Sequence, residues 1–288
     1  MLTTYSIKNA ASAVIDHLHD APIAYDYGVD ALTDALTTGP GHMVTICAKT
    51  GTGKTALALQ IAQSMAKSGL NVAFLSLEMD ANALAERLLA RAGTMAAIRH
   101  RDATPAQEAA MRAASRELQK IPLDLVEANG CTVDEVASYI NNHPYVDVLI
   151  IDYLQLLGGR EANAYERAVN ASKALATLAR ETGKAMICLA QQNLKGEGAD
   201  GAPRLGTIQG STQYEQDSNA VLGLSREIES DPDSRRVIQI NKNRNGPAGK
   251  KIFLDFDGNR MVFSESADQN PRKKPSFNFN PAQPSRSM

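Results

Sequence analysis

The apolar residues of this chain alternate between short continuous runs and longer segments with helical spacing. Mostly apolar runs, several of them rich in β-branched residues, occupy residues 43–48, 72–77, 123–126, 146–151 and 185–190. Runs of this length predict buried strands, and apolar positions repeated every three or four residues between them predict amphipathic helices. Strands that alternate with helices predict an α/β fold whose mainly parallel sheet is covered by helices on both faces.

The C-terminal part has a different pattern. Predicted strands at residues 221–224, 237–240 and 252–256 follow one another without long helices, and residues 251–263 resemble a hairpin that turns at Asp257-Gly258. These features predict antiparallel strands at one edge of the sheet. Beyond residue 264 the chain is polar and proline-containing, which predicts a disordered tail over residues 265–288. Its basic residues 272–274 suit either a solvated tail or a contact with DNA or a partner.

Several helices have clear start and stop signals. Thr104-Pro105-Ala106-Gln107 has the sequence of a capping box and opens a predicted helix that ends near residue 120. Thr132 and Glu135 have the same spacing. A long helix is predicted over residues 165–181, and Gly183 ends it.

The first residues also have helical spacing, at Ile7, Ala11, Val14, Ile15 and Leu18. Such a helix can pack on its own domain or dock on a neighbouring subunit, and the sequence leaves both open. We therefore expect a helical linker segment over residues 1–26, one α/β domain over 27–264 and the tail over 265–288.

Composition limits the classes of protein to consider. A chain of 288 residues with 43% hydrophobic and 22% charged residues is typical of one large globular domain with tails. No apolar run approaches the roughly 18 residues of a membrane span, and no signal peptide is recognisable. Cys47, Cys131 and Cys188 lack metal-ligand spacing and suit a reducing cytoplasm. The net charge of −2 disfavours a wholly basic nucleic-acid binder but permits a local basic channel.

Residues 48–55 (AKTGTGKT) match the Walker A pattern except at the first position, where alanine replaces glycine. The preceding apolar strand and the following helix are the context that this motif requires. Glycines allow backbone N–H groups to surround an anion, Lys54 reaches the β- and γ-phosphates, and Thr55 binds Mg²⁺. The segment predicts binding of ATP, or another nucleoside triphosphate, with Mg²⁺ by Ala48, Lys49, Thr50, Gly51, Thr52, Gly53, Lys54 and Thr55.

The run at residues 148–152 (VLIID) has the Walker B form, in which Asp152 helps to hold Mg²⁺. In many AAA+ ATPases the next residue is a glutamate that orients water, but here it is Tyr153. Glu78, which follows the strand predicted at residues 72–77, is the alternative base. If that strand lies beside the phosphate-loop strand, Glu78 and Asp152 share the ligand-binding edge of the sheet.

Five short motifs resemble the ordered motif set of the DnaB-type replicative DNA helicases. They are residues 76–79 (SLEM), 150–156 (IIDYLQL), 189–191 (LAQ), 215–217 (EQD) and 242–247 (KNRNGP). The resemblance extends over residues 27–263. It implies a RecA-like P-loop NTPase core that forms a hexameric ring around single-stranded DNA and translocates 5′ to 3′.

The resemblance also assigns roles to single residues. It implies that Glu78 is the catalytic base, that Asp152 belongs to the metal shell and that Gln191 senses the γ-phosphate. Arg244 matches the arginine finger of the family, and Lys242 stands beside it. Both would reach the nucleotide of a neighbouring subunit. Without the resemblance, these two cations would be read as a solvated basic turn.

Two departures from the family limit these expectations. About forty residues precede the first strand, so we expect a phage- or plasmid-like form without the N-terminal collar, and neither primase nor loader can be inferred. The DNA-contact loop is expected at residues 194–210, where Ile208-Gln209 replaces the usual Leu-Arg pair. Candidate DNA contacts are Lys195, Arg204, Gln209, Gly210 and Ser211, which offer charge or polar groups to the phosphates.

Three functions therefore remain open. The first hypothesis is a ring-forming, DNA-stimulated helicase motor that serves a small viral or plasmid replicon. The alternative is a RecA-like accessory or recombination ATPase that binds DNA without unwinding it. A RecA-like signalling ATPase without DNA is the third, and residues 153–156 and 242–247 favour the first.

Overall fold

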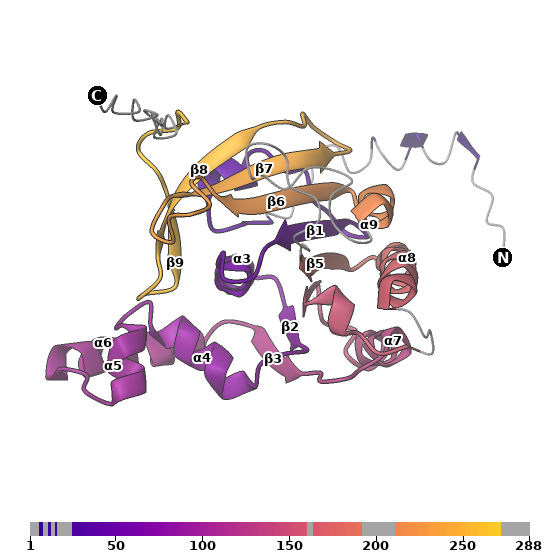
Figure 1. Cartoon of the computed structure of the whole chain (residues 1–288). Coiled ribbons are helices and arrows are strands. Elements are labelled where there is room, and N and C mark those ends of the chain that lie inside the picture. The colour runs from indigo at the N-terminus through magenta and orange to yellow at the C-terminus, as the bar shows by residue number, and fades with distance from the viewer. Residues whose placement is uncertain are drawn as a thin grey trace, which may run out of the picture.

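The computed structural model describes residues 25–159, 164–191 and 211–271, together with residues 6, 7, 11, 12 and 15. Within this part of the chain, one nine-stranded sheet has the order β3-β2-β4-β5-β1-β6-β7-β8-β9 (Figure 1). The strands are β1 (Met43–Ala48), β2 (Val72–Ser76), β3 (Leu123–Glu127), β4 (Val148–Asp152), β5 (Ala185–Gln191), β6 (Ala220–Arg226), β7 (Arg236–Asn243), β8 (Lys251–Asp257) and β9 (Val262–Glu265).

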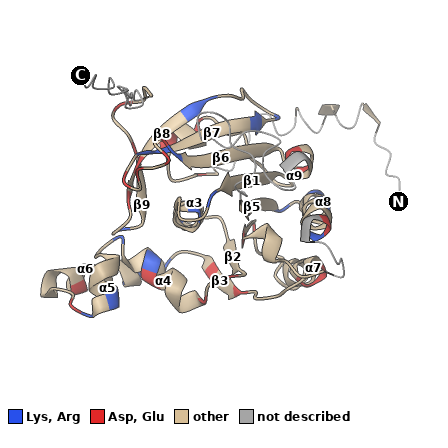
Figure 2. Cartoon of the chain, viewed as in Figure 1, with Lys and Arg blue, Asp and Glu red and all other residues tan. Residues whose placement is uncertain are grey.

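Strands β3 to β6 in this order are parallel, and β6 to β9 are joined by antiparallel pairs. Every residue of β1, β2 and β4 is buried, as expected for central strands covered on both faces. Charged residues are sparse on the central strands and gather on the helices and outer strands (Figure 2). The predicted parallel sheet with an antiparallel edge is confirmed.

The helices connect and cover the strands. They are α2 (Asp30–Thr33), α3 (Lys54–Lys67), α4 (Ala81–Leu89), α5 (Met95–His100), α6 (Pro105–Leu118), α7 (Val133–Asn142), the 3₁₀ turn η1 (Leu154–Leu156), α8 (Ala164–Thr182) and α9 (Ser211–Asp217). Both predicted capping boxes are present, at Thr104 with Gln107 and at Thr132 with Glu135. None of the described helices is long and apolar enough to cross a membrane.

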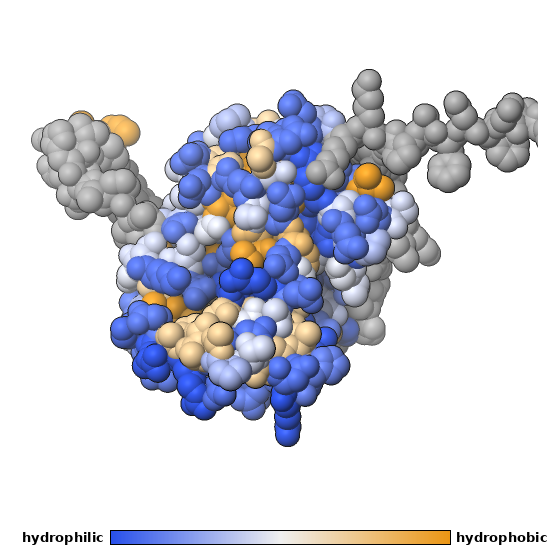
Figure 3. Space-filling model, turned by 90° about the vertical axis from the view of Figure 1, so that its left-hand side faces the viewer, coloured by the Kyte–Doolittle hydropathy of each residue, from blue (hydrophilic) through white to orange (hydrophobic). Residues whose placement is uncertain are grey.

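Between β2 and β3 the chain forms an extension of three helices, α4 to α6. Helix α6 buries none of its residues fully, and Met111 packs its thioether against Gly93, where a Cβ atom would approach the sulfur to 2.8 Å. Figure 3 views the molecule from the side of α5 and α6 and shows a pale apolar patch among hydrophilic side chains. The exposed alanines of α6 are Ala106, Ala109, Ala110 and Ala113.

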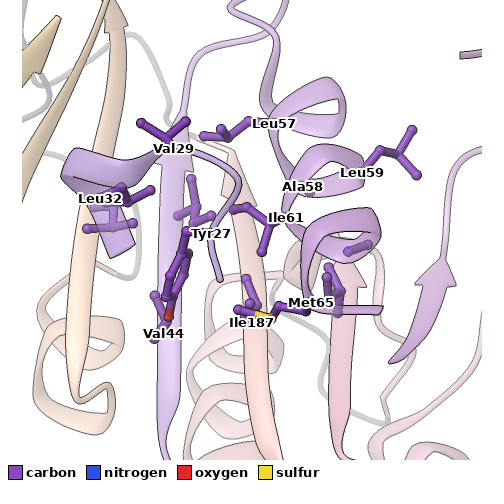
Figure 4. Packing of buried hydrophobic residues seen from close by; sticks show 14 of the residues in the cluster. Tyr27, Val29, Leu32, Val44, Leu57, Ala58, Leu59, Ile61, Met65 and Ile187 are labelled. Carbon is purple, nitrogen blue, oxygen red and sulfur yellow. The ribbon is translucent and has the colours of Figure 1, made fainter. Parts of the chain in front are cut away.

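Two hydrophobic clusters occupy the two faces of the sheet. On one face, Leu57 and Ile61 of α3 pack with Val44, Tyr27 and the other residues in Figure 4. On the other face, α7 and α8 contribute a cluster that includes Leu175. Because α3 begins directly after the phosphate loop, this burial fixes the loop against the sheet.

The sequence left open whether the strand before Glu78 lies beside the phosphate-loop strand. Strand β2 does not lie beside β1, because β4 and β5 separate the two. Instead β2 pairs with β4, and Ser76 lies in register with Asp152. The carboxyl ends of β2 and β4 therefore still meet at one edge of the sheet. A run of apolar residues cannot specify which parallel neighbour a strand takes, since each connection passes through a helix.

The packed part of the chain continues beyond the predicted boundary at residue 264. Arg235, whose side chain is 2% exposed, pairs with Glu227 at 2.9 Å. It also donates to Ser266 Oγ at 3.2 Å and to the carbonyl oxygens of Asp268 and Asn270. These contacts tie residues 266–270 to the segment directly before β7. The rest of the predicted tail, 272–288, lies outside the described residues, as do Val14 and Leu18 of the predicted N-terminal helix.

Cys47, Cys131 and Cys188 are free thiols. Burial raises the pKa of both Cys47 and Cys188 to about 12, so these two stay protonated. Within the described residues, no three His, Cys, Asp or Glu side chains gather into a metal-binding group.

Candidate active site

The phosphate loop joins β1 to α3 in a conformation that its glycines permit. Gly51 and Gly53 have φ values of 75° and 105°, and Gly53 is the N-cap of α3. A Cβ atom at Gly53 would lie 2.8 Å from Cζ of Phe263. Glycine is therefore required at position 53 both for its φ angle and for the close approach of β9.

Side chains from three strands hold the loop from outside. Arg226 Nη2 donates to the carbonyl of Gly51 at 3.1 Å, and Arg236 Nε donates to that of Thr52 at 3.1 Å. Gln191 Nε2 donates to Thr50 Oγ1 at 2.8 Å. The hydrogen bonds from these arginines to carbonyl groups of the phosphate loop fix its backbone conformation.

Lys54, Thr55 and Asp152 form the polar centre of the site. Thr55 Oγ1 donates to Asp152 Oδ2 at 2.7 Å, and Lys54 Nζ lies 3.9 Å from Asp152 Oδ1. Burial raises the pKa of Asp152, an effect that Lys54 and Thr55 oppose. Burial lowers the pKa of Lys54, which the nearby carboxylates oppose.

The residues of this centre fit a divalent cation. Asp152 is 2% exposed, and among the described residues its Oδ1 is buried without a hydrogen-bond partner. A buried carboxylate oxygen without a donor is costly, and a hard cation beside it would relieve that cost. The hydroxyl of Thr55 and the carboxylate of Asp152 are the oxygen ligands that Mg²⁺ prefers. These two side chains would hold the ion.

Tyr153 occupies the position after the Walker B aspartate, and the peptide bond between the two residues is cis. The ammonium of Lys54 lies 4.2 Å from the centroid of the Tyr153 ring. Burial and the nearby Glu78 and Asp152 raise the pKa of the Tyr153 hydroxyl, so it stays protonated. Tyr153 therefore supports Lys54 by a cation–π contact and is no base.

Glu78 is exposed at the end of β2 and lines the same cavity as Lys54 and Thr55. The cavity has a volume of about 310 Å³. Polar groups line one part of it, and Met79, Phe256 and Met261 add apolar surface. Phe256 is held by stacking on Phe263, with ring centroids 4.4 Å apart. A cavity with both kinds of lining suits a phosphorylated ligand with an aromatic part.

Gln191, the predicted phosphate sensor, also lines this cavity. Its backbone N–H donates to Gln155 Oε1 at 3.1 Å, and its carbonyl accepts from Gln155 Nε2 at 3.0 Å. This pair fixes the end of β5 to η1. Residues 192–210, which include Lys195, Arg204, Gln209 and Gly210, lie outside the described residues, and Ser211 begins α9.

Lys242 and Arg244 lie away from the cavity. Ala220 of β6 is in register with Val44 of β1 and with Asn243 of β7, so the end of β7 lies at the same edge of the sheet as the start of β1. The five residues from Val44 to Ala48 span about 13 Å along β1, and the phosphate loop follows the far end of this strand from the edge where β7 ends. Arg244 Nη2 donates to the carbonyl of Gln216 at 2.6 Å, and Lys242 Nζ donates to that of Glu215.

Sequence reasoning missed several residues that line the cavity, namely Arg87, Phe256 and Met261. Phe256 and Met261 flank the hairpin turn that was predicted, but nothing in the sequence places this hairpin against the phosphate loop. Arg87 follows Glu78 on the next helix, and only the packing of α4 shows that its side chain reaches the cavity.

Comparison with known proteins identifies the relatives of this chain. Residues 27–265 match the family described as DnaB-like helicase C-terminal domain. The chain belongs to this family. It is 32% identical over 253 residues to the replicative DNA helicase DnaB of Leifsonia xyli subsp. xyli, a match that covers 83% of this chain and 54% of the relative. It is 29% identical over 283 residues to a probable plasmid replicative DNA helicase of Chlamydia muridarum, covering 91% and 62%.

This DnaB-like chain thus spans between half and two thirds of the length of these curated relatives. Among solved structures, it resembles the ATPase domain of G40P with a TM-score of 0.84 and 26% identity, covering 92% of this chain and all of that one. The RadB recombinase, at 17% identity and a TM-score of 0.55 over 84% of this chain and 99% of that one, shares the fold. The predicted RecA-like α/β fold is therefore confirmed.

Proposed function

We propose that this DnaB-like chain is the nucleoside triphosphate-driven motor of a replicative DNA helicase. The observation that carries the proposal is the convergence of Lys54, the Thr55–Asp152 pair and Glu78 on one cavity in a chain of this family. A cation and free amide groups at the start of α3 bind phosphate, and an exposed carboxylate beside them can receive a proton.

The residues of the cavity have different roles in ATP hydrolysis. Residues 48–55 bind the phosphates, and Lys54 is the most important of them. Gln191 senses the terminal phosphate. Thr55 and Asp152 would hold Mg²⁺, which would supply positive charge to the phosphate oxygens. Glu78 accepts a proton from the attacking water. Lys242 and Arg244 act on the nucleotide of a neighbouring subunit, since they lie at the opposite edge of their own sheet.

The motor works as a homo-oligomeric ring of six subunits, as implied by its resemblance to the DnaB-type helicases. It moves 5′ to 3′ along single-stranded DNA. The DNA contacts are Lys195, Arg204, Gln209, Gly210 and Ser211. Gln191 links these residues to the nucleotide, because it is the last residue of β5 and residues 192–210 follow it directly in the chain. Phosphate binding at the site can in this way change the DNA contact.

A second candidate is an ATPase that binds DNA without unwinding it. Ile208-Gln209 favours it, because these residues replace a pair that includes an arginine in the helicases this sequence resembles. Electron microscopy with an ATP analogue and single-stranded DNA, combined with strand separation on a forked duplex, distinguishes the two. Rings that separate strands support the helicase, and open filaments without separation support the alternative.

The primary test is Mg²⁺-dependent ATP hydrolysis with and without single-stranded DNA. We expect measurable hydrolysis that rises when DNA is added, and DNA affinity that falls steeply with salt and depends little on base sequence. Absence of Mg²⁺-dependent hydrolysis under both conditions would refute the motor.

Replacing Lys195 and Arg204 together by alanine should weaken DNA binding and its stimulation while basal hydrolysis is retained. Loss of two phosphate contacts should also reduce the slope of log affinity against log salt by about 1.4 for a single strand. The measurement is fluorescence anisotropy across a salt series. An unchanged slope would move the DNA contact to another part of the chain.

A further inference from the structure

Residues 266–270, which we call the strap, directly follow β9 and lie just beyond the part of the chain that matches the family. The amide of Gln269 pairs with the backbone of Phe253 in β8. Phe253 N donates to Gln269 Oε1 at 3.0 Å, and Gln269 Nε2 donates to the carbonyl of Phe253 at 2.9 Å. Ser266 N donates to the same carbonyl at 2.9 Å. The strap therefore continues the pairing of β9 along β8.

Arg235 also binds the strap. Its guanidinium donates to Ser266 Oγ at 3.2 Å and to the carbonyls of Asp268 and Asn270, the last at 2.8 Å. The side chain is 2% exposed, and its Cζ lies 4.9 Å from the centroid of the Phe253 ring. Because the donors of a guanidinium have a fixed planar arrangement, these contacts define one position for the strap.

The same guanidinium closes the base of the turn between β6 and β7, residues 227–235. Arg235 Nε and Nη2 donate to the two carboxylate oxygens of Glu227, both at 2.9 Å. Glu227 N donates in return to the carbonyl of Arg235 at 2.8 Å. A buried bidentate pair of this kind is specific in its geometry. The strap and the turn therefore share one anchor.

The turn and the strand ends beside it hold the phosphate loop. The two arginines that flank the turn donate to carbonyls of the loop, and within the turn Glu229 pairs with Lys49 of the loop at 3.0 Å. Arg236, one of the two arginines, also donates to the carbonyl of Pro232 at 2.9 Å, which ties it to the turn. The position of the turn therefore affects the phosphate loop at three points.

We propose that the strap is a conformational device that couples the C-terminal segment of the chain to nucleotide binding. With the strap bound, Arg235 is fixed and the turn holds the phosphate loop in the conformation that receives phosphate. With the strap released, the turn and the loop gain freedom that nucleotide binding must remove. This inference rests on the proposed function in one respect, namely that the phosphate loop binds a nucleotide.

Such a coupling acts in both directions. If the bound strap raises the affinity for nucleotide, bound nucleotide must stabilise the strap by the same factor. A partner that detaches the C-terminal segment would therefore weaken nucleotide binding without any contact with the cavity.

Ser266→Ala and Gln269→Ala, combined in the whole chain, test the coupling. The double variant removes the hydroxyl that Arg235 binds and the amide that pairs with β8. Arg235 itself is kept, because its loss would leave Glu227 buried without this partner and would destabilise the fold. Asn270→Ala is the matched control, since Arg235 binds the backbone carbonyl of Asn270, which alanine retains.

We expect the affinity of the double variant for Mg·ADP and for a non-hydrolysable Mg·ATP analogue to fall about 5-fold or more, the lower limit typical of coupling between two sites. Neither Ser266 nor Gln269 lines the cavity, so a lost contact with the nucleotide cannot explain such a fall. Asn270→Ala should bind both nucleotides as the wild type does. Circular dichroism at the assay temperature shows whether each variant is folded.

The reciprocal effect is measured on the wild type by amide hydrogen exchange. Saturating Mg·ADP should slow exchange at Phe253 and Ser266 about 5-fold or more. Strand β3, at the other edge of the sheet, is the reference that separates this effect from a general stabilisation by the ligand. This measurement decides the proposal even if the double variant does not fold.

Equal nucleotide affinities in the folded double variant and in Asn270→Ala would overturn the coupling. So would exchange at Phe253 and Ser266 that nucleotide leaves unchanged or slows no more than at β3. A wild-type protein that binds no nucleotide is a different failure, since it refutes the proposed function before any variant is compared.

Discussion

Glu78→Gln is expected to bind ATP almost as well as the wild type and to hydrolyse it about 10²–10⁴-fold more slowly. Glutamine keeps the size of the side chain and its ability to orient water, but it cannot accept the proton. Because Glu78 is exposed and lies at the end of β2, the substitution should leave the packing of the sheet unchanged. Single-turnover hydrolysis and nucleotide binding, measured on the same preparation, separate chemistry from binding.

Glu86→Gln is the matched control, because Glu86 is an exposed glutamate on α4 and does not line the cavity. It should retain wild-type turnover. Near-normal hydrolysis by Glu78→Gln would contradict the assignment of the base. Among the acidic side chains that line the cavity or lie at its centre, this would leave Asp152, whose Oδ2 already accepts from Thr55.

The parts of the fold that depend on local sequence were predictable. The capping boxes at Thr104 and Thr132 involve residues three positions apart, and both form as expected. The hairpin of β8 and β9 likewise depends on the short turn after Asp257. In each case the interacting residues are close in the chain, so the sequence contains the whole interaction.

The order of the strands was not predictable in the same way. Strand β2 takes β3 and β4 as neighbours, and the intervening helices allow other arrangements of equally apolar strands. Nonetheless Glu78 and Asp152 share one edge, because parallel strands end on the same side whichever of them are adjacent. The two carboxylates therefore share an edge although β2 does not lie beside the phosphate-loop strand.

The candidate site likewise combines residues that local motifs predict with contacts that only tertiary packing produces. Walker A and Walker B motifs identify Lys54, Thr55 and Asp152 from sequence, since their spacing is set by a strand, a loop and a helix. The stacking of Phe256 on Phe263, the Lys54–Tyr153 contact and the position of Arg87 at the cavity arise from packing between distant segments. No local sequence pattern predicts these contacts.

Arg244→Ala is expected to lose about 10³–10⁵-fold of hydrolysis, the effect of removing an arginine finger. In its own subunit Arg244 lies beyond the end of β7, at the edge of the sheet opposite to the phosphate loop, and donates to the carbonyl of Gln216. Its guanidinium therefore cannot serve its own nucleotide without a large movement. Lys250→Ala is the control, because Lys250 is a nearby exposed cation that also donates to a carbonyl, that of Ala31 at 3.4 Å.

Mixing Arg244→Ala with Lys54→Ala should restore hydrolysis, although each variant alone is expected to be inactive. An Arg244→Ala subunit keeps its phosphate loop, and an adjacent Lys54→Ala subunit keeps its finger, so their shared interface has one complete site. The measurement is ATP hydrolysis as a function of mixing ratio, with both variants shown by mass spectrometry to be in one assembly. Full activity of Arg244→Ala alone would refute the finger. Absence of recovery in verified mixed assemblies would refute independent sites shared between subunits, because a complete site would then be present and silent.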